Sequence, residues 1–486
     1  MSKKSSRRAR RKTRSVSTRP EHRIAEGVEE EGRFPSTAPH AEARARHTAL
    51  IIAALLLLAA ALYSWNAYSI RGLVGYDAKR HLEYALTISF EQRLPHPLEG
   101  WSTFHPPLYY VLASFAYSAL RPYGVEAAVI SVRVISIVSM LVAGLVSFTL
   151  VLRLGASPVV SAVAAALVLF VPCSQLAATA IGNEALGVAF AALALSALVR
   201  LQANPWNLRA AAFAGLMSAL ALATKYTGLF VAAACIIPFC RRDFDRRMLR
   251  ALVLCAVVGM AVAGPVYVRN IMLTGSPVPM TRELEPMKSA EKKFVIRERR
   301  LVDYLWINPA SLWRPTLFHV KGQEPSLENR NPAMTNVWGL VYASVWYDAF
   351  RHRIPLEYHH DGIYSGRILT FLGSVPTSMA LFGFLVALGE FFRRRGRIPD
   401  APVVLMSALG LVIFIAFTAR APSAVAVKAS YMLPLVVPAA VFYVRGVSLL
   451  GERSRTAVLA ISVVAAIAAG LIFANGVIFP PLAVPK

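Results

Sequence analysis

The chain has 486 residues, of which 56% are hydrophobic and only 16% are charged, and its formal net charge is +25 at pH 7. Soluble domains carry about 25% charged residues, so this composition excludes an ordinary soluble globule and indicates a polytopic membrane protein. The positive charge does not indicate nucleic-acid binding. The arginines lie mainly in the N-terminal tail and in short loops between apolar segments, where membrane topology requires them.

The N-terminal segment, residues 1–46, is rich in Arg, Lys, Ser and Glu and shows no apolar period. Such a composition predicts disorder. The charged region is too long for a cleavable signal peptide, and no small-residue cleavage site follows a short apolar core. We therefore expect a basic cytoplasmic tail that rests against anionic membrane lipids.

Apolar segments that fit a bilayer core about 30 Å thick follow almost to the C-terminus. They predict an all-α membrane protein of about eleven spans, at about 48–70, 127–152, 158–181, 185–201, 208–224, 227–240, 249–271, 366–392, 402–419, 429–446 and 456–474. A shorter apolar segment, 106–120, is expected to lie at the interface as a helix that does not cross. With that count the basic turns fall on the side of the tail, as the positive-inside rule requires.

This topology divides the chain into four parts. A cytoplasmic tail (1–46) precedes an N-terminal transmembrane module (47–271), which includes a first extracytoplasmic loop at 71–126. A second extracytoplasmic loop, 272–365, is expected to fold as a cap, and the C-terminal helices follow at 366–486. The expected location is a bacterial plasma membrane, with the N-terminus in the cytoplasm and both large loops outside.

The first loop opens with a cluster of titratable side chains at residues 76–84, which we expect to form an amphipathic helix at the interface. Three- and four-residue spacing places one set of side chains on a shared face. These are Asp77, Arg80, His81 and Tyr84. A carboxylate at the membrane surface can accept the proton of an incoming hydroxyl nucleophile. The alternative is an ordinary helix cap with a salt bridge.

The same loop ends with the sequence His105-Pro-Pro-Leu-Tyr-Tyr. Two prolines hold the chain extended and then permit a helix to begin, so His105 is fixed just ahead of an aromatic helix that carries Tyr109. At this place an imidazole can meet a phosphate or a hydroxyl group. The alternative is a helix-entry turn whose aromatic side chains anchor the interface.

Charged residues at the ends of apolar segments form a third group. A charge at the bilayer centre costs roughly 3 kcal/mol, so such residues are functional candidates by default. Those in this chain are Glu184, Lys225, Arg420, Lys428 and Arg133. The predicted topology puts them on the face that bears Asp77, where a ring of cations suits an anionic lipid headgroup. Snorkelling of the side chains to the interface is the alternative.

The four cysteines, Cys173, Cys235, Cys240 and Cys255, lie in or beside apolar segments. They have neither the spacing of a zinc site nor that of a secreted disulfide framework, so we expect each to pack in the core. Acidic and imidazole side chains of the first loop and of residues 359–361 are suitable metal ligands. No single stretch gives a compact ligand set, so no cofactor is expected and a divalent metal is not favoured.

Several short motifs, in this order and spacing, resemble those of the GT-C class of glycosyltransferases, in the group of protein O-mannosyltransferases and lipid A aminoarabinose transferases. They are Tyr76-Asp77, the Pro-Pro-Leu-Tyr-Tyr sequence about 30 residues later, Asn183-Glu184, Thr224-Lys225-Tyr226-Thr227-Gly228, Tyr267-Val-Arg269-Asn270 and Ser430-Tyr431-Met-Leu-Pro434. The resemblance covers most of the chain, from about 48 to 446. The chain departs from many relatives in having Ala78 rather than a second acidic residue after Asp77, and in lacking an arginine directly before Tyr431.

The resemblance implies transfer of a sugar from a polyprenyl-phosphate donor to an acceptor on the outer face, with inversion at the anomeric carbon. Asp77 matches the catalytic aspartate of the first loop, and Lys225 matches a lysine near the donor phosphate. His105 stands where relatives often have Lys or His. His81, Arg80, Tyr109, Glu184, Arg420 and Lys428 complete the set expected to contact substrate. The acceptor class (lipid, glycan or protein) stays open.

A lipid or solute transporter is the alternative function. It predicts charged groups near the middle of several spans and an inverted repeat between halves of the chain. The charged residues gather instead at the ends of spans and in two large loops, which favours the enzyme.

Overall fold

The computed structural model describes residues 38–69, 75, 77–279, 299–307, 336–347, 360–420 and 426–478. The chain divides into two compact units, 1–47 and 48–486, and the fold described below belongs to the second. Within the described ranges all regular structure is helical, which confirms the predicted all-α class. The predicted basic tail falls mostly outside these ranges, as does most of the predicted cap loop.

The helices follow the apolar pattern of the sequence. They are α1 (Ala38–Ser69), α2 (Ala78–Glu91), α3 (Leu108–Leu120), α4 (Val125–Arg153), α5 (Pro158–Phe170), α6 (Pro172–Thr179), α7 (Glu184–Ala203), α8 (Leu208–Thr224), α9 (Leu229–Ala234), α10 (Arg246–Thr274), α12 (Val302–Leu305), α14 (Val337–Trp346), α15 (His360–Arg393), α16 (Ala401–Arg420), α17 (Val436–Ser448) and α18 (Glu452–Ile478). Short 3-10 turns are η1 (Arg121–Tyr123), η2 (Tyr226–Gly228), η3 (Ile237–Phe239) and η7 (Ala429–Leu435).

Eight of the described helices are long and apolar enough to cross a membrane. The pair α5 and α6, bent by 58° at its break, makes a ninth if it counts as one span. Two shorter apolar segments, Leu208–Thr224 and Tyr226–Phe239, coincide with the remaining predicted spans. Each predicted segment is therefore helical, while the count of about eleven crossings stays a prediction. Helix α3, with 13 residues, is not among the eight and packs against α2 and α4.

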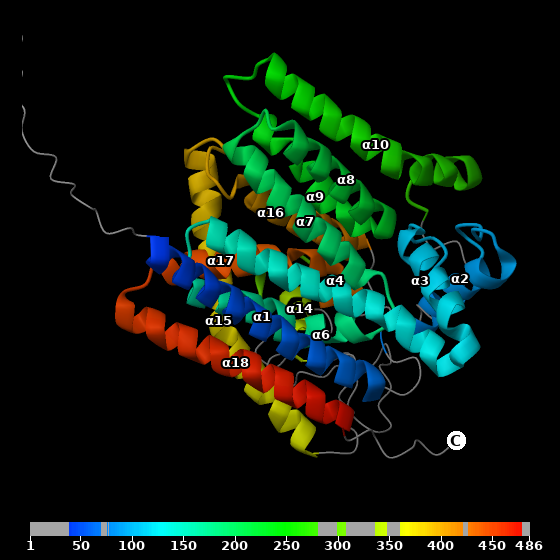
Figure 1. Cartoon of the computed structure of the whole chain (residues 1–486), viewed down its shortest axis with the longest axis horizontal. Helices are drawn as coiled ribbons and strands as arrows, with labels where there is room; N and C mark the ends of the chain where they lie inside the picture. The colour runs from blue at the N-terminus through cyan, green and yellow to red at the C-terminus, as the bar shows by residue number, and fades with distance from the viewer. Residues whose placement is uncertain are drawn as a thin grey trace, which may run out of the picture. The chain divides into compact units, whose positions relative to one another are not determined.

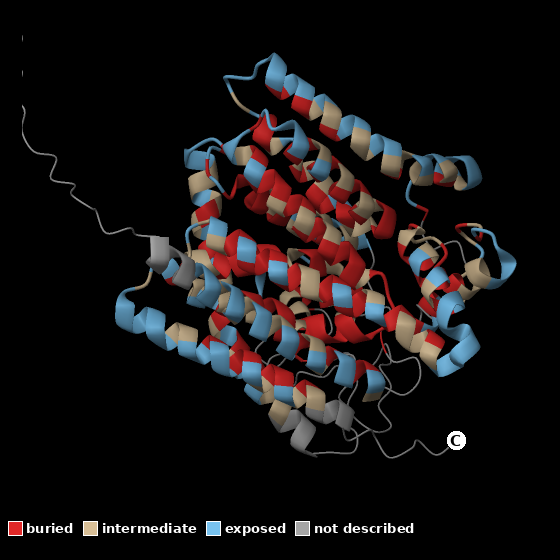
Figure 2. Ribbon diagram, in the orientation of Figure 1, coloured by how far each residue is buried: buried red, intermediate tan, exposed pale blue. Residues whose placement is uncertain are grey.

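Helices α4 and α7 form the buried centre of this unit, as the red ribbons in Figure 2 show. Helix α7 packs against both α4 and α8, and α17 packs against α4, α5 and α15 (Figure 1). Helices α1 and α10 instead expose apolar side chains such as Leu57, Leu58, Val257 and Met260. The backbone N–H and C=O groups of a helix are hydrogen-bonded to each other within the helix. These apolar surfaces are therefore suited to contact with lipid.

Helices α15 and α17 approach each other closely at two glycines. A Cβ atom added to Gly383 would collide with the carbonyl oxygen of Phe442, and one added to Gly446 would collide with that of Met379. Small residues at such crossings allow close backbone packing, which drives helix association where lipid removes the hydrophobic effect. This crossing therefore depends on both glycines.

We expect Gly446→Val to destabilise the protein, since overpacking costs about 1–3 kcal/mol even where side chains can yield, and here the contact is backbone. Thermal unfolding of the purified protein in detergent measures this. Gly389→Val is the matched control, because a Cβ at Gly389 on α15 meets nothing within 4 Å. Equal melting temperatures for the two variants would contradict the close-packing account.

One end of the bundle carries the basic turns and a charged cluster between α15, α16 and α17. Arg445 pairs with Asp400 and, at 2.6 Å, with Glu390. Cys240 lies at this end and is exposed, so the expectation that it packs in the core is wrong. The short segment Tyr226–Phe239 ends just before it, which leaves the thiol beyond the packed helices. Cys173 and Cys255 are buried as expected.

Candidate functional site

The opposite end of the bundle, which we call the site rim, gathers the segment ends that the sequence predicts to share one side. Arg133 on α4 donates to the carbonyl oxygen of Ala67 in the last turn of α1, at 2.5 Å. Asn183, just before α7, donates to the carbonyl oxygen of Thr224 at the end of α8, at 3.1 Å. Helices α2 and α3 lie beside this rim, at the right of Figure 1. The structure thus brings the first loop to the ends of α7 and α8.

A buried ion pair lies at the centre of the site rim. Lys225 Nζ is 2.7 Å from Glu184 Oε1, and the side chains are only 6% and 15% exposed. Glu184 is the first residue of α7, and Lys225 follows the last residue of α8 in an extended conformation. Lys225 Nζ also lies 5.6 Å from the ring centroid of Tyr431, within range of a cation–π interaction. The lysine is therefore a fixed, charged group at the rim.

Two imidazoles lie beside this pair. His81 is buried on α2, with Nδ1 2.7 Å from the hydroxyl oxygen of Tyr110, and its ring stacks on that of His105 at 5.6 Å. The other face of His105 is covered by Phe104, at 4.0 Å between ring centroids. Burial is the largest influence and lowers the pKa of both His81 and His105, although the negative charges of Glu184 and Asp77 partly oppose it at His81. Both rings are thus neutral near pH 7.

Asp77 stands at the N-cap of α2 in a left-handed conformation, with φ 55° and ψ 18°. Its side chain is exposed and makes no capping hydrogen bond, so the capping alternative is not what the structure shows. Its backbone carbonyl oxygen accepts a hydrogen bond from the backbone nitrogen of His81 at 2.9 Å. Asp77 is therefore held next to His81 along the chain, and its carboxylate has no capping role.

The predicted common face of α2 is wrong for Arg80. The helix begins at Ala78, and its buried side includes His81 and Tyr84. Arg80, although four residues before Tyr84, is turned to solvent at the edge of that side and pairs with Glu83 at 2.8 Å, with both side chains about half exposed. Asp77 precedes the helix, so its left-handed backbone and not helical spacing sets its position.

The other predicted residues have different surroundings. The hydroxyl oxygen of Tyr109 accepts a hydrogen bond from the backbone nitrogen of Gly182 at 3.0 Å, and the side chain is fully buried in the wall behind the site. Lys428, half-buried just before η7, acts electrostatically on His81. Arg420 is exposed at the end of α16. His359 and the side chains of residues 360 and 361 lie outside the described part of the chain.

Two site residues were absent from the predicted set, although both belong to motifs quoted for the family resemblance. Tyr110 holds the His81 ring, and it comes from the Pro-Pro-Leu-Tyr-Tyr sequence. Ser430 lines a cavity next to Glu184, and it comes from the late Ser-Tyr sequence. The motifs therefore carried a signal that single-residue reasoning did not use.

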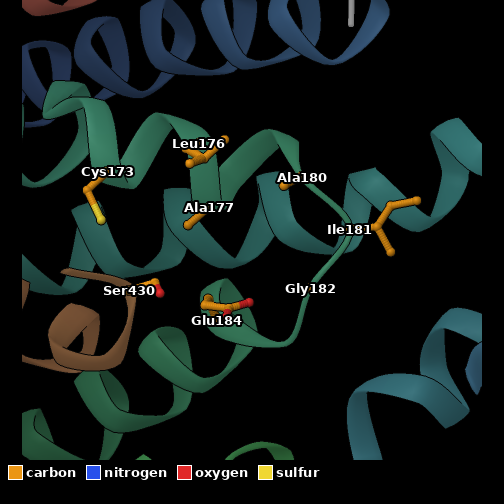
Figure 3. A pocket seen from close by; sticks show the side chains of 8 residues that line it. All are labelled: Cys173, Leu176, Ala177, Ala180, Ile181, Gly182, Glu184 and Ser430. Carbon is orange, nitrogen blue, oxygen red and sulfur yellow. The ribbon is translucent and has the colours of Figure 1, made fainter. Parts of the chain in front are cut away.

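A small pocket opens beside Glu184, between α6, the loop that follows it, and η7. It is lined by Cys173, Leu176, Ala177, Ala180, Ile181, Gly182, Glu184 and Ser430. In Figure 3 the Glu184 and Ser430 side chains lie near each other at its polar end, while small apolar side chains form the opposite wall. Among the described residues, no three histidine, cysteine, aspartate or glutamate side chains are grouped to hold a metal ion.

Comparison with known proteins places this arrangement in a structural class. No protein-family model and no curated protein matches the sequence. Among solved structures, apo ArnT from Cupriavidus metallidurans superposes with a TM-score of 0.50 at 13% identity, over 84% of this chain and 61% of ArnT. The chain has a GT-C-like fold. It spans about three fifths of the length of ArnT.

Other structures with a GT-C-like fold give weaker superpositions. The apo oligosaccharyltransferase of Archaeoglobus fulgidus superposes with a TM-score of 0.49 at 16% identity, over 88% of this chain and 56% of that one. ArnT has also been crystallised with undecaprenyl phosphate bound.

Proposed function

We propose that the chain is a membrane glycosyltransferase that moves a sugar from a polyprenyl-phosphate donor to an acceptor, with inversion. The observation that carries this proposal is the buried Lys225–Glu184 pair beside His81, on the helix that Asp77 directly precedes, at one rim of a GT-C-like bundle. The binding of undecaprenyl phosphate by ArnT supports a lipid-linked donor. The basic turns at the other end of the bundle support a cytoplasmic position for that end, and an extracytoplasmic site.

In the proposed reaction, the acceptor hydroxyl attacks the anomeric carbon while Asp77 accepts its proton as general base. The bond between the anomeric carbon and the phosphate oxygen breaks, and the lipid leaves as a phosphate with one more negative charge. Lys225 and the histidines beside it stabilise that developing charge. In this proposal His105 and Lys428 also contact the phosphate group of the donor, and Arg420 adds a further positive charge to that part of the site.

A donor panel tests the proposal. The purified protein in proteoliposomes is incubated with a set of polyprenyl-phosphate sugars, and release of polyprenyl phosphate is followed. We expect release with at least one sugar in the presence of an acceptor-containing membrane extract. Transport of the intact lipid without cleavage would instead support the transporter.

The turn at Gly75, two residues before Asp77, fixes where Asp77 lies relative to the loop before Glu184. The φ of Gly75 is 132°, and an added Cβ would lie 2.7 Å from Cβ of Ala180 in the loop before Glu184. We expect Gly75→Ala to lower kcat about tenfold or more, because the turn must move and a strained backbone costs of order 1–3 kcal/mol. Steady-state kinetics with the active donor measures this.

Gly124→Ala is the matched control. Gly124 has a φ of 112°, yet an added Cβ meets nothing within 4 Å. It therefore introduces the same kind of backbone strain without the collision. A similar fall in kcat for both variants would show that contact with Ala180 does not position Asp77.

A further inference from the structure

The buried ion pair at the centre of the site, Lys225 with Glu184, has no net charge to offer an incoming anion. Their charges cancel, since Lys225 Nζ lies 2.7 Å from Glu184 Oε1. The neighbouring side chains of His105 and Tyr110 are neutral. A phosphate group that enters such a site brings an uncompensated charge, and burying an unpaired charge is costly.

Glu184 already occupies the position that a phosphate oxygen would take on Lys225. Its Oε1 atom lies 2.7 Å from Lys225 Nζ, a distance typical of charge-assisted hydrogen bonds. Its other oxygen, Oε2, has room only because residue 182, in the loop before α7, is a glycine, since a Cβ at Gly182 would lie 2.5 Å from it. The same Cβ would lie 3.6 Å from Cδ2 of His81, so carboxylate and imidazole are close neighbours.

We propose that Glu184 is a resident counter-ion that the phosphate of an anionic lipid displaces from Lys225, and that His81 takes up one proton as this happens. The inference rests on the proposed function for the identity of the ligand and goes beyond it in assigning a role to Glu184. The incoming negative charge and the released carboxylate both favour imidazolium, and His81 is the imidazole whose ring lies close to the Glu184 carboxylate.

The proposal makes phosphate binding depend on pH in a defined direction. A group that is neutral in the free protein and protonated in the complex strengthens binding as pH falls. Between its two pKa values, uptake of one proton changes the dissociation constant about tenfold per pH unit. Burial lowers the pKa of His81 in the free protein, so the lower limit of this pH dependence lies below the ordinary imidazole pKa.

The test is calorimetric titration of the full-length protein in detergent with farnesyl methyl phosphate, a phosphodiester whose single charge does not change near neutral pH. Titrations in buffers of different ionisation enthalpy count the protons. We expect proton uptake approaching one and binding that weakens as pH rises through 7, by up to about tenfold per pH unit. Binding with no proton uptake and no pH dependence would overturn the proposal, and this measurement needs no variant.

Variants then locate the groups. Glu184→Gln should bind the diester about tenfold or more tightly near pH 7, with little pH dependence, because the competing charge is gone. His81→Gln should lose the proton uptake. Weaker binding by Glu184→Gln, or unchanged proton uptake by His81→Gln, would overturn the assignment. Glu83→Gln, on the exposed side of α2, is the matched control and should bind like the unmodified protein.

Lys225→Met separates this inference from the proposed function. If Lys225→Met binds the diester as tightly as the unmodified protein, Lys225 does not hold the phosphate and the proposed site fails. If Lys225→Met loses binding while Glu184→Gln gains none, the proposed function stands and only the counter-ion role of Glu184 fails.

Discussion

Asp77→Asn is expected to abolish sugar transfer while leaving the protein folded. A positioned general base contributes about 10²–10⁴-fold to the rate, and asparagine cannot accept the proton of the acceptor. The side chain is exposed and makes no capping hydrogen bond. Its replacement by an isosteric amide therefore removes no cap. Asparagine also tolerates the left-handed backbone that this position requires.

The measurement is turnover of the active polyprenyl-phosphate sugar in proteoliposomes, with melting temperature as the check on folding. Asp243→Asn is the control, since Asp243 is exposed in a basic turn at the other end of the bundle. Substantial turnover by Asp77→Asn would remove Asp77 from its role as base. An inactive variant with an unchanged melting temperature would support it.

Lys225→Met is expected to lower kcat/KM for the lipid donor by about 10²–10³-fold, mainly through loss of stabilisation of the departing phosphate. The substitution also strands Glu184 as an unpaired, largely buried charge. Removal of one partner from a buried ion pair costs about 3–5 kcal/mol of stability. The single variant therefore mixes a functional effect with a folding effect.

The double variant Lys225→Met/Glu184→Gln separates the two effects. Both charges are removed together, so the double variant should recover much of the melting temperature lost by the single one. Donor use should stay low, because no ammonium group remains at this place. Donor kinetics restored to those of the unmodified protein would exclude a phosphate role for Lys225.

Helix positions could be predicted from the sequence because the physics that sets them is local. Apolar segments long enough to cross a membrane are helical in the structure. Polar residues cap the starts of three helices as expected: the side chains of Ser157, Asn207 and Asp245 accept hydrogen bonds from backbone nitrogens of the first turn. The break between α5 and α6 could not be read in the same way. It is stabilised by Gln175, whose amide donates to the carbonyl oxygens of Phe170 and, far along the chain, Ala469.

The site was predictable as a set of residues but not as a set of contacts. Topology placed Glu184 and Lys225 on one side, yet their pairing depends on how α7 and α8 pack, which no local pattern records. The stacking of His81 on His105 likewise joins residues 24 positions apart through the docking of α2 on α3. Arg80 was misplaced because helical spacing does not show where the buried side of α2 ends: Tyr84 is buried, while Arg80 at its edge is half exposed and pairs with Glu83.

The central claim is that Asp77 and Lys225 serve one phosphate-sugar site. An experimental structure of the protein with bound polyprenyl phosphate tests it most directly. The account predicts the phosphate within hydrogen-bonding distance of Lys225 Nζ, in a cavity that the Asp77 carboxylate also faces. A phosphate bound at the opposite end of the bundle, or in a cavity closed off from Asp77, would contradict it.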